Sequence, residues 1–302
     1  MFVASPPSIT VRTGLPLIRA ERRVFTGTAE FLDDPANRAR TAEYLTDMAR
    51  AYGRDGPASV SAGQSYGEMA EALIGSVVSA DEPVDLLVLA FAVHDLWPSR
   101  QTAAYLSGVT PGTPLAFAIC DQGSAAAFSG LTIAREYAAS AGVRRALLIV
   151  VEQAEMPYDC AAPLPLRHQG VAMLYGPSPS MLGRVVGVRQ HPAVAPDDVA
   201  RIAAEDLNAL AKDCGHVAVV CNDALASLWS APAAGRVRVA APGQPATGVW
   251  SDLIEELSRP DRHSASSRAG DGRPDLVVAA DYDPDLRYLC LTGFATGPDL
   301  ST

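Results

Sequence analysis

The chain has 302 residues, of which 48% are hydrophobic and 19% are charged, so it can bury one large core or the core of two fused α/β halves. Its formal net charge is -10 and its basic residues are scattered, which argues against nucleic acid as a partner. The first residues lack the segments of a signal peptide and no apolar run reaches membrane-spanning length, so we expect a cytoplasmic protein without a membrane partner.

The first half of the chain predicts alternating helices and strands. Residues 1–38 contain short strand-like pieces that are broken by prolines. A continuous apolar run at Val84–Val93 is typical of a parallel strand that is buried on both faces. The other predicted elements are helices at Thr41–Gly53, at Tyr66–Ala80 and around Ser99–Leu106, a strand that ends at Ile119, a helix from Ser124, and a strand at Ala146–Val151. Such alternation favours a layered α/β fold.

In the second half, this order recurs weakly. Two strands are predicted within Arg167–His191, and a helix at Pro196–Lys212 follows them. The remaining elements are strands at His216–Asn222, Arg236–Ala241, Pro274–Asp281 and Arg287–Phe294, a helix after the first of these strands, and a helix at Val249–Leu257. We therefore predict an N-terminal half at 1–176 and a C-terminal half at 177–302, with a polar, mobile surface loop at 258–274.

The segment Pro114–Tyr137 is the most informative part of the chain. An apolar strand runs into a sharp polar turn, and the following helix opens on Ser124 among small residues. Such a turn, a nucleophile elbow, lifts one side chain to a helix N-terminus, where free N–H groups and the helix dipole favour developing negative charge. Small neighbours let a substrate or another backbone segment approach closely. Ser124 is therefore the candidate nucleophile.

Together with the strands and turns at Val84–Ser99 and Val143–Gln153, this segment resembles the first half of a thiolase-fold protein. The order of elements is similar to ketoacyl-ACP synthase III and its secondary-metabolic relatives, and the match covers about Val84–Gly176. The resemblance implies a thiolase-like fold, in which two pseudo-repeated halves form a layered αβαβα core. It also places Ser124 where the family has the cysteine that accepts an acyl group from CoA or acyl carrier protein.

The second half departs from the family at three places. The resemblance puts Cys221 where the family has a histidine, and Gln244 near the position of an asparagine. In the family, these two groups stabilise a thioester oxyanion and assist decarboxylation. The sequence DYDPDLRY stands in place of the family's glycine-rich loop between the last two strands. Acyl transfer or hydrolysis is therefore expected rather than decarboxylative carbon–carbon bond formation, with Cys221 and Gln244 as candidate substrate-binding residues.

A serine nucleophile needs a base within hydrogen-bond reach, because an alcohol is a poorer nucleophile than a thiolate. His168 is the candidate base, and the competing interpretation is a structural histidine. For Ser124 the competing interpretation is a helix N-cap or a packing residue. Asp121 and Gln122 are polar groups in an otherwise apolar elbow and must find partners or water, so they are candidates for a substrate pocket or a dimer interface.

Metal and nicotinamide roles are not expected. The five cysteines are widely spaced without a C-x-x-C pair, which is typical of small buried residues in a reducing compartment. The chain has neither a cluster of His, Asp and Glu nor a G-x-G-x-x-G motif after a strand. We predict no bound cofactor, and an acyl-CoA or acyl carrier protein thioester as the substrate.

Two hypotheses about function follow. In the first, the protein is an acyltransferase of polyketide or fatty-acyl secondary metabolism that takes an acyl group from a CoA or carrier-protein thioester through Ser124. In the second, it is a non-catalytic partner subunit that pairs with an active ketosynthase and shapes its pocket. Because thiolase-fold proteins dimerise by joining their central sheets, the resemblance also implies a homodimer or a heterodimer with a related ketosynthase.

Overall fold

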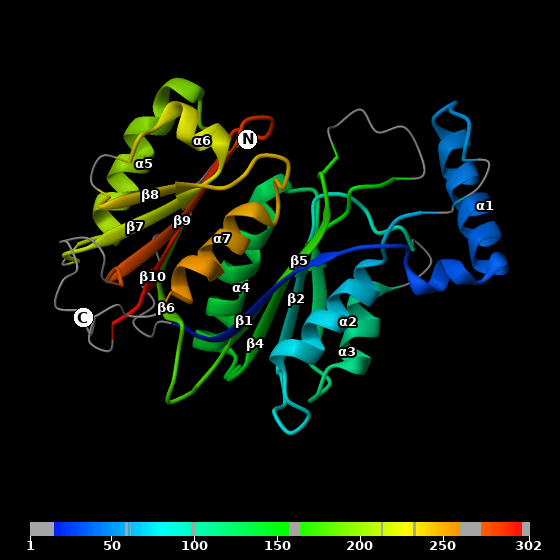
Figure 1. Cartoon of the computed structure of the whole chain (residues 1–302), viewed down its shortest axis with the longest axis horizontal. Helices are drawn as coiled ribbons and strands as arrows, with labels where there is room; N and C mark the ends of the chain where they lie inside the picture. Colours follow the sequence, from blue (N-terminus) through cyan, green and yellow to red (C-terminus); the bar gives the residue numbers. More distant parts are fainter. Residues whose placement is uncertain are drawn as a thin grey trace.

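A computed structural model describes residues 15–57, 60, 62–97, 101–156, 164–212, 214–231, 234–259 and 273–297. Within these ranges ten strands form one hydrogen-bonded sheet in the order β3-β2-β4-β5-β1-β6-β10-β9-β7-β8 (Figure 1). The strands of the first half are β1 (Leu15–Phe25), β2 (Leu86–Ala90), β3 (Leu115–Ile119), β4 (Ala146–Glu152) and β5 (His168–Tyr175). Those of the second half are β6 (Gly183–His191), β7 (Val217–Cys221), β8 (Arg236–Val239), β9 (Leu276–Asp283) and β10 (Tyr288–Ala295).

The two halves of the sheet repeat the same strand order. In each half the second strand pairs in parallel with the third and the fourth, and the fifth and first strands are antiparallel to their neighbours. The two halves meet at β1, where Leu15–Leu17 pair with Gly183–Val185 of β6. The pairing of β1 with β5 shifts register between Leu17 and Arg19 and then continues to Phe25. The predicted boundary between residues 176 and 177 lies in the connection from β5 to β6 and stays a prediction.

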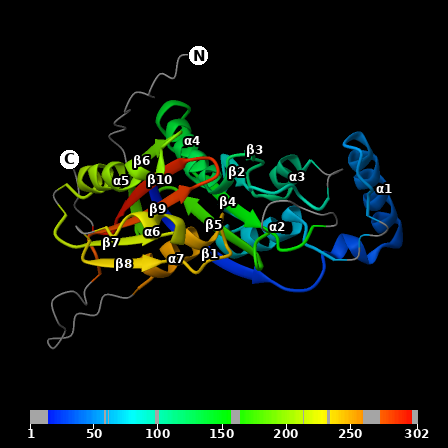
Figure 2. The same cartoon turned by 90° about the horizontal axis from the view of Figure 1, so that it is seen from above.

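Helices α2 to α7 lie in three layers, and α1 lies apart from them at one end of the molecule (Figures 1 and 2). Their bounds are α1 (Pro35–Ala51), α2 (Tyr66–Val77), α3 (Thr102–Val109), α4 (Ala126–Ser140), α5 (Pro196–Leu210), α6 (Asp223–Leu228) and α7 (Gly248–Leu257). Helices α2 and α3 cover the outer face of the first-half strands, and α5 and α6 cover that of the second-half strands. Helices α4 and α7 pack between the two halves of the sheet, which gives the predicted layered core.

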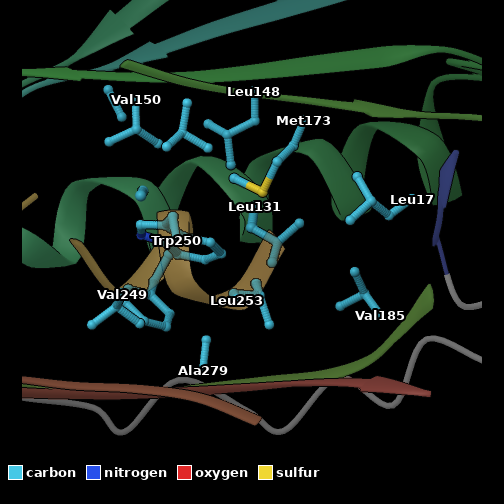
Figure 3. Close-up of a cluster of buried hydrophobic side chains, with 14 of the residues drawn as sticks. Leu17, Leu131, Leu148, Val150, Met173, Val185, Val249, Trp250, Leu253 and Ala279 are labelled. Carbon is cyan, nitrogen blue, oxygen red and sulfur yellow. The ribbon is translucent and has the colours of Figure 1, made fainter. Parts of the chain in front are cut away.

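The central layer joins both halves through one apolar cluster (Figure 3). Leu148 and Met173 project from the first-half strands, and Val185 projects from the second-half strands, towards the two central helices. Trp250 of α7 is fully buried, and its ring lies 4.7 Å from the ring of Phe128 in α4. Because these aromatic residues sit near the start of their helices, the first turns of α4 and α7 are packed together.

Several element bounds differ from the sequence predictions. Strand β1 is one continuous strand through Pro16, and residues 30–33, predicted to be strand-like, form a 3-10 turn that buries Phe31 and Leu32. Helix α1 begins six residues before Thr41, because Pro35 occupies its first position and the Asp34 carboxylate caps the Ala36 N–H. Most of the predicted mobile loop at 258–274 lies outside the described residues.

Candidate functional site

The predicted elbow lies between β3 and α4. Asp121 and Gly123 have positive φ angles of 60° and 52°, so the chain turns sharply after the strand. A Cβ at Gly123 would collide with the Asp283 carboxylate, so this position requires glycine for both its φ angle and the close approach. Residues Gly123–Ala125 form one 3-10 turn before α4, and Ser124 within it is 7% exposed.

The Ser124 hydroxyl donates a hydrogen bond to the carboxylate of Asp281. It makes no capping bond to the helix backbone, which rules out the N-cap interpretation. Asp281 lies near the end of β9 and is 2% exposed. Burial raises the pKa of Asp281 to about 7 and the charges of Asp283 and Asp223 add to the rise, while the Ser124 hydrogen bond opposes it. Asp281 can therefore accept a proton near neutral pH.

The carboxylate of Asp283 accepts hydrogen bonds from the backbone of the elbow and of the turn between β9 and β10. One of its carboxylate oxygens, Oδ2, accepts the Ser124 N–H at 3.3 Å. The other, Oδ1, accepts the N–H groups of Asp285 and Leu286 at 3.1 and 3.0 Å, within the turn between β9 and β10. The turn between β9 and β10 thus places a carboxylate on an N–H group that could otherwise stabilise an oxyanion.

Two buried thiols border Asp281. Cys221 ends β7, and burial together with the charge of Asp281 raises its pKa to about 11. Cys290 lies directly opposite Asp281 on β10, and burial raises its pKa well above its usual value. Both thiols are therefore protonated at neutral pH, and neither supplies a proton acceptor at the site. The structure brings Cys221 and Ser124 to the same buried carboxylate.

The two polar residues of the elbow find partners within the protein. The Asp121 carboxylate accepts a weak hydrogen bond from the Cys120 thiol, with sulfur and oxygen 3.3 Å apart. Gln122 Oε1 accepts from the Ser129 hydroxyl at 2.6 Å, and Ser129 Oγ accepts from Gln190 Nε2 at 3.1 Å. Gln122 is therefore tied to α4 and β6, while Asp121 is exposed at the turn.

A second polar cluster surrounds the start of α7. Gln244 Nε2 donates to Glu152 Oε1 at 2.7 Å, and Gln244 Oε1 accepts the Arg167 N–H at 2.9 Å. Glu152, buried at the end of β4, also accepts the N–H groups of Ala246 and Thr247 at 2.9 and 3.2 Å and the Thr247 hydroxyl proton. Burial raises the pKa of Glu152, and these donors oppose the rise. Glu152 thus binds the turn that leads into α7, and Gln244 belongs to this cluster rather than to the Ser124 cluster.

His168 lies at the start of β5, where its Nδ1 accepts the Ala154 N–H at 3.2 Å. Burial lowers its pKa, with the Glu155 charge opposing, so the ring is neutral at pH 7. Side chains alternate along β5: Met173 faces the central layer, whereas Leu174 faces the outer helices. His168 has the parity of Leu174, so its side chain is directed to the outer layer, whereas the titratable group hydrogen-bonded to Ser124 is the carboxyl of Asp281.

The two central helices therefore have the same arrangement of acidic side chains near their N-termini. The N-terminus of α4 faces Asp281 and Asp283 from β9, and that of α7 faces Glu152 from β4, the equivalent strand of the other half. Sequence reasoning missed all three carboxylates. The available signal was acidic residues at the ends of otherwise apolar strands, ALLIVVE and LVVAADYD.

Among the described residues, no group of three or more His, Cys, Asp and Glu side chains could hold a metal ion. No helix in this part of the chain has both the length and the apolar character needed to cross a membrane.

Comparison with known proteins identifies the fold. No family model matches the sequence, and no curated protein matches it. Among solved structures, 3-oxoacyl-[acyl-carrier-protein] synthase III from Aquifex aeolicus is 13% identical with a TM-score of 0.56, covering 93% of this chain and 100% of its own. The tetronic acid condensing enzyme AbyA1 is 15% identical with a TM-score of 0.58, covering 93% and 99%.

A third similar structure is Xanthomonas campestris OleA with bound lauric acid and lauroyl-CoA, which is 13% identical with a TM-score of 0.59, covering 94% of this chain and 100% of its own. These likenesses confirm the predicted thiolase-like α/β fold of ketoacyl-ACP synthase III-like enzymes. At such low identity they establish the fold and not the reaction.

Proposed function

We propose that the protein is an acyltransferase of secondary metabolism that takes an acyl group from a CoA or carrier-protein thioester onto Ser124. The observation that carries this proposal is the hydrogen bond from the Ser124 hydroxyl to Asp281, whose pKa is raised to about 7. A general base works best when its pKa lies near the working pH. The fold supports the substrate class, because similar structures include condensing enzymes and one with bound lauroyl-CoA.

In the proposed reaction, Ser124 Oγ attacks the thioester carbonyl while Asp281 takes the hydroxyl proton. The carbon–sulfur bond breaks, and the departing thiolate receives the proton from Asp281. An alcohol, an amine or water then attacks the seryl ester and passes its own proton to Asp281, and the proton returns to Ser124 as the ester breaks. Asp283 has to leave the Ser124 N–H so that this group can bind the oxyanion.

Decarboxylative condensation is not part of the proposal. The position that the family gives to histidine holds Cys221, a neutral thiol, and Gln244 is engaged by Glu152 and Arg167. Neither group is free to stabilise the enolate that loss of carbon dioxide would leave. The proposed chemistry is therefore acyl transfer or hydrolysis.

Intact-mass spectrometry tests the proposal with a panel of acyl-CoA and acyl-carrier thioesters. The native protein should gain the mass of one acyl group, Ser124→Ala should gain none, and Asp281→Asn should acylate at least about 100-fold more slowly. Cys120→Ser serves as a matched control, because its thiol lies next to the elbow and should not affect the adduct. An adduct that persists in Ser124→Ala would assign the chemistry to another residue and refute the proposal.

The contact between Asp283 and the Ser124 N–H favours a second candidate function, a non-catalytic subunit that pairs with an active ketosynthase. The edge strand β3 also leaves Leu115 54% exposed, and an exposed edge can pair with another sheet. Asp283→Ala separates the two candidates. If the protein transfers acyl groups, freeing this N–H should accelerate acylation, whereas a partner subunit should form no adduct in either protein and should co-purify with a ketosynthase.

A further inference from the structure

A cavity of about 310 Å³ lies beside the start of α7, outside the Ser124 cluster. Its walls come from the end of β1, the start of β5, β8 and one face of α7. Gln244 is part of its lining, but Ser124, Asp281 and Asp283 are not. The volume falls in the range of pockets that bind small molecules.

The lining carries an excess of positive charge. Arg238 bonds Glu255 at 2.7 and 3.0 Å and Asp252 at 2.9 Å, and Arg22 reaches Glu255 at 2.9 Å. The two lining carboxylates, Asp252 and Glu255, thus form ion pairs with two of the four lining arginines. The other two, Arg23 and Arg167, have no carboxylate partner in the described part of the chain, and Arg23 lies over the Phe25 ring at 5.2 Å. Two positive charges remain uncompensated in a protein whose net charge is -10.

A buried amide also lines this cavity. Gln169 is 4% exposed and is one of the residues that line the cavity. Met173 and Val171, which share its side of β5, belong to the central core, so Gln169 faces the same layer as α7. The carboxamide can supply both a donor and an acceptor to a bound group.

We propose that this cavity binds a phosphate monoester. Guanidinium groups match phosphate oxygens in geometry, and a phosphate monoester carries close to two negative charges at neutral pH, which balances the excess. Gln169 can donate to a phosphate oxygen, and the volume leaves room for an organic group beyond the phosphate. Binding here does not depend on acyl transfer through Ser124.

Isothermal titration calorimetry with glycerol 3-phosphate tests the site, with inorganic phosphate and acetate as comparison probes. The native protein and Ser124→Ala should bind the ester with a Kd below about 1 mM. Arg167→Gln should weaken binding at least about 10-fold, as should Gln169→Leu. Arg201→Gln, which removes an exposed arginine on α5, should bind like the native protein.

Three results would overturn the assignment: no binding of the ester by the native protein, equal affinity in Arg167→Gln, or equally tight binding of acetate. Binding of inorganic phosphate without the ester would refute the monoester. Because Arg167 is exposed, its replacement should leave folding intact even if Gln169→Leu does not fold. Since Ser124→Ala retains this cavity, the outcome is independent of whether the protein transfers acyl groups.

Discussion

Replacing Asp281 with asparagine should stabilise the protein at neutral pH. A buried carboxyl whose pKa is raised from 3.8 to about 7 binds its proton more tightly in the folded state. Stability due to this group is therefore complete below pH 4 and is lost as pH rises towards 7. The difference in pKa corresponds to about 4 kcal/mol, at about 1.4 kcal/mol for each pH unit. The asparagine side chain mimics the protonated carboxyl in shape and charge, so the variant should escape this loss.

Urea denaturation at pH 5 and pH 8 measures the effect. The native protein should lose about 3 kcal/mol more than Asp281→Asn between these pH values, because the carboxyl deprotonates over this range. Asp47→Asn, at an exposed position of α1, is the matched control and should follow the native curve. If the free energy of unfolding of Asp281→Asn showed the same pH dependence as that of the native protein, the carboxyl of Asp281 would not titrate near neutral pH. The proposal that it acts as a general base would then be refuted.

Three other perturbations test the site and the sheet edge. Glu152→Ala should cost about 3–5 kcal/mol in urea denaturation, because it leaves several buried donors at the start of α7 unpaired, whereas the exposed Glu155→Ala should be close to neutral. Gly123→Ala should cost at least about 1–3 kcal/mol, because it combines a positive φ with a collision against Asp283; Gly108→Ala, in open space on α3, should be neutral or slightly stabilising. Leu115→Lys should convert a dimer to a monomer in analytical ultracentrifugation with little change in stability, and a native protein that sediments as a monomer would contradict pairing through β3.

Periodicity and local turn chemistry predicted most of the fold. Within the apolar run at Val84–Val93, Leu86–Ala90 form a buried parallel strand, and the segment Pro114–Tyr137 forms the expected strand, turn and helix. The repeat of strand order was visible because each half has the same alternation of elements. Element boundaries were predicted less well. Helix α1 starts six residues before its predicted start, because the cap at Asp34 and Pro35, and not the apolar spacing, sets its first residue.

The chemistry of the site could be predicted only in part. Ser124 was found because its signal is local, whereas its partner Asp281 lies 157 residues away and reaches it only through the packing of β9 against the elbow. His168 was favoured because its segment, RHQGVAMLYG, resembles the one that leads from the family's active-site region into a strand, but side-chain parity on β5 directs it to the outer layer. Parity is sensitive to a shift of one residue, and a sequence alone does not fix the register against a distant element.

The carboxylates that bind the turns before α4 and α7 differ in how firmly they are held, and this difference bears on where the proposed chemistry can occur. Glu152 accepts hydrogen bonds from Gln244, Ala246 and Thr247, so its carboxylate is fully engaged at the start of α7. Asp283 holds the Ser124 N–H by one bond of 3.3 Å, and its other bonds belong to the turn between β9 and β10. A small movement of that turn would free the Ser124 N–H group and leave the hydrogen bonds of Glu152 before α7 intact. The proposed reaction at Ser124 therefore requires opening at one helix only, and the second helix can keep the central layer in place while this occurs.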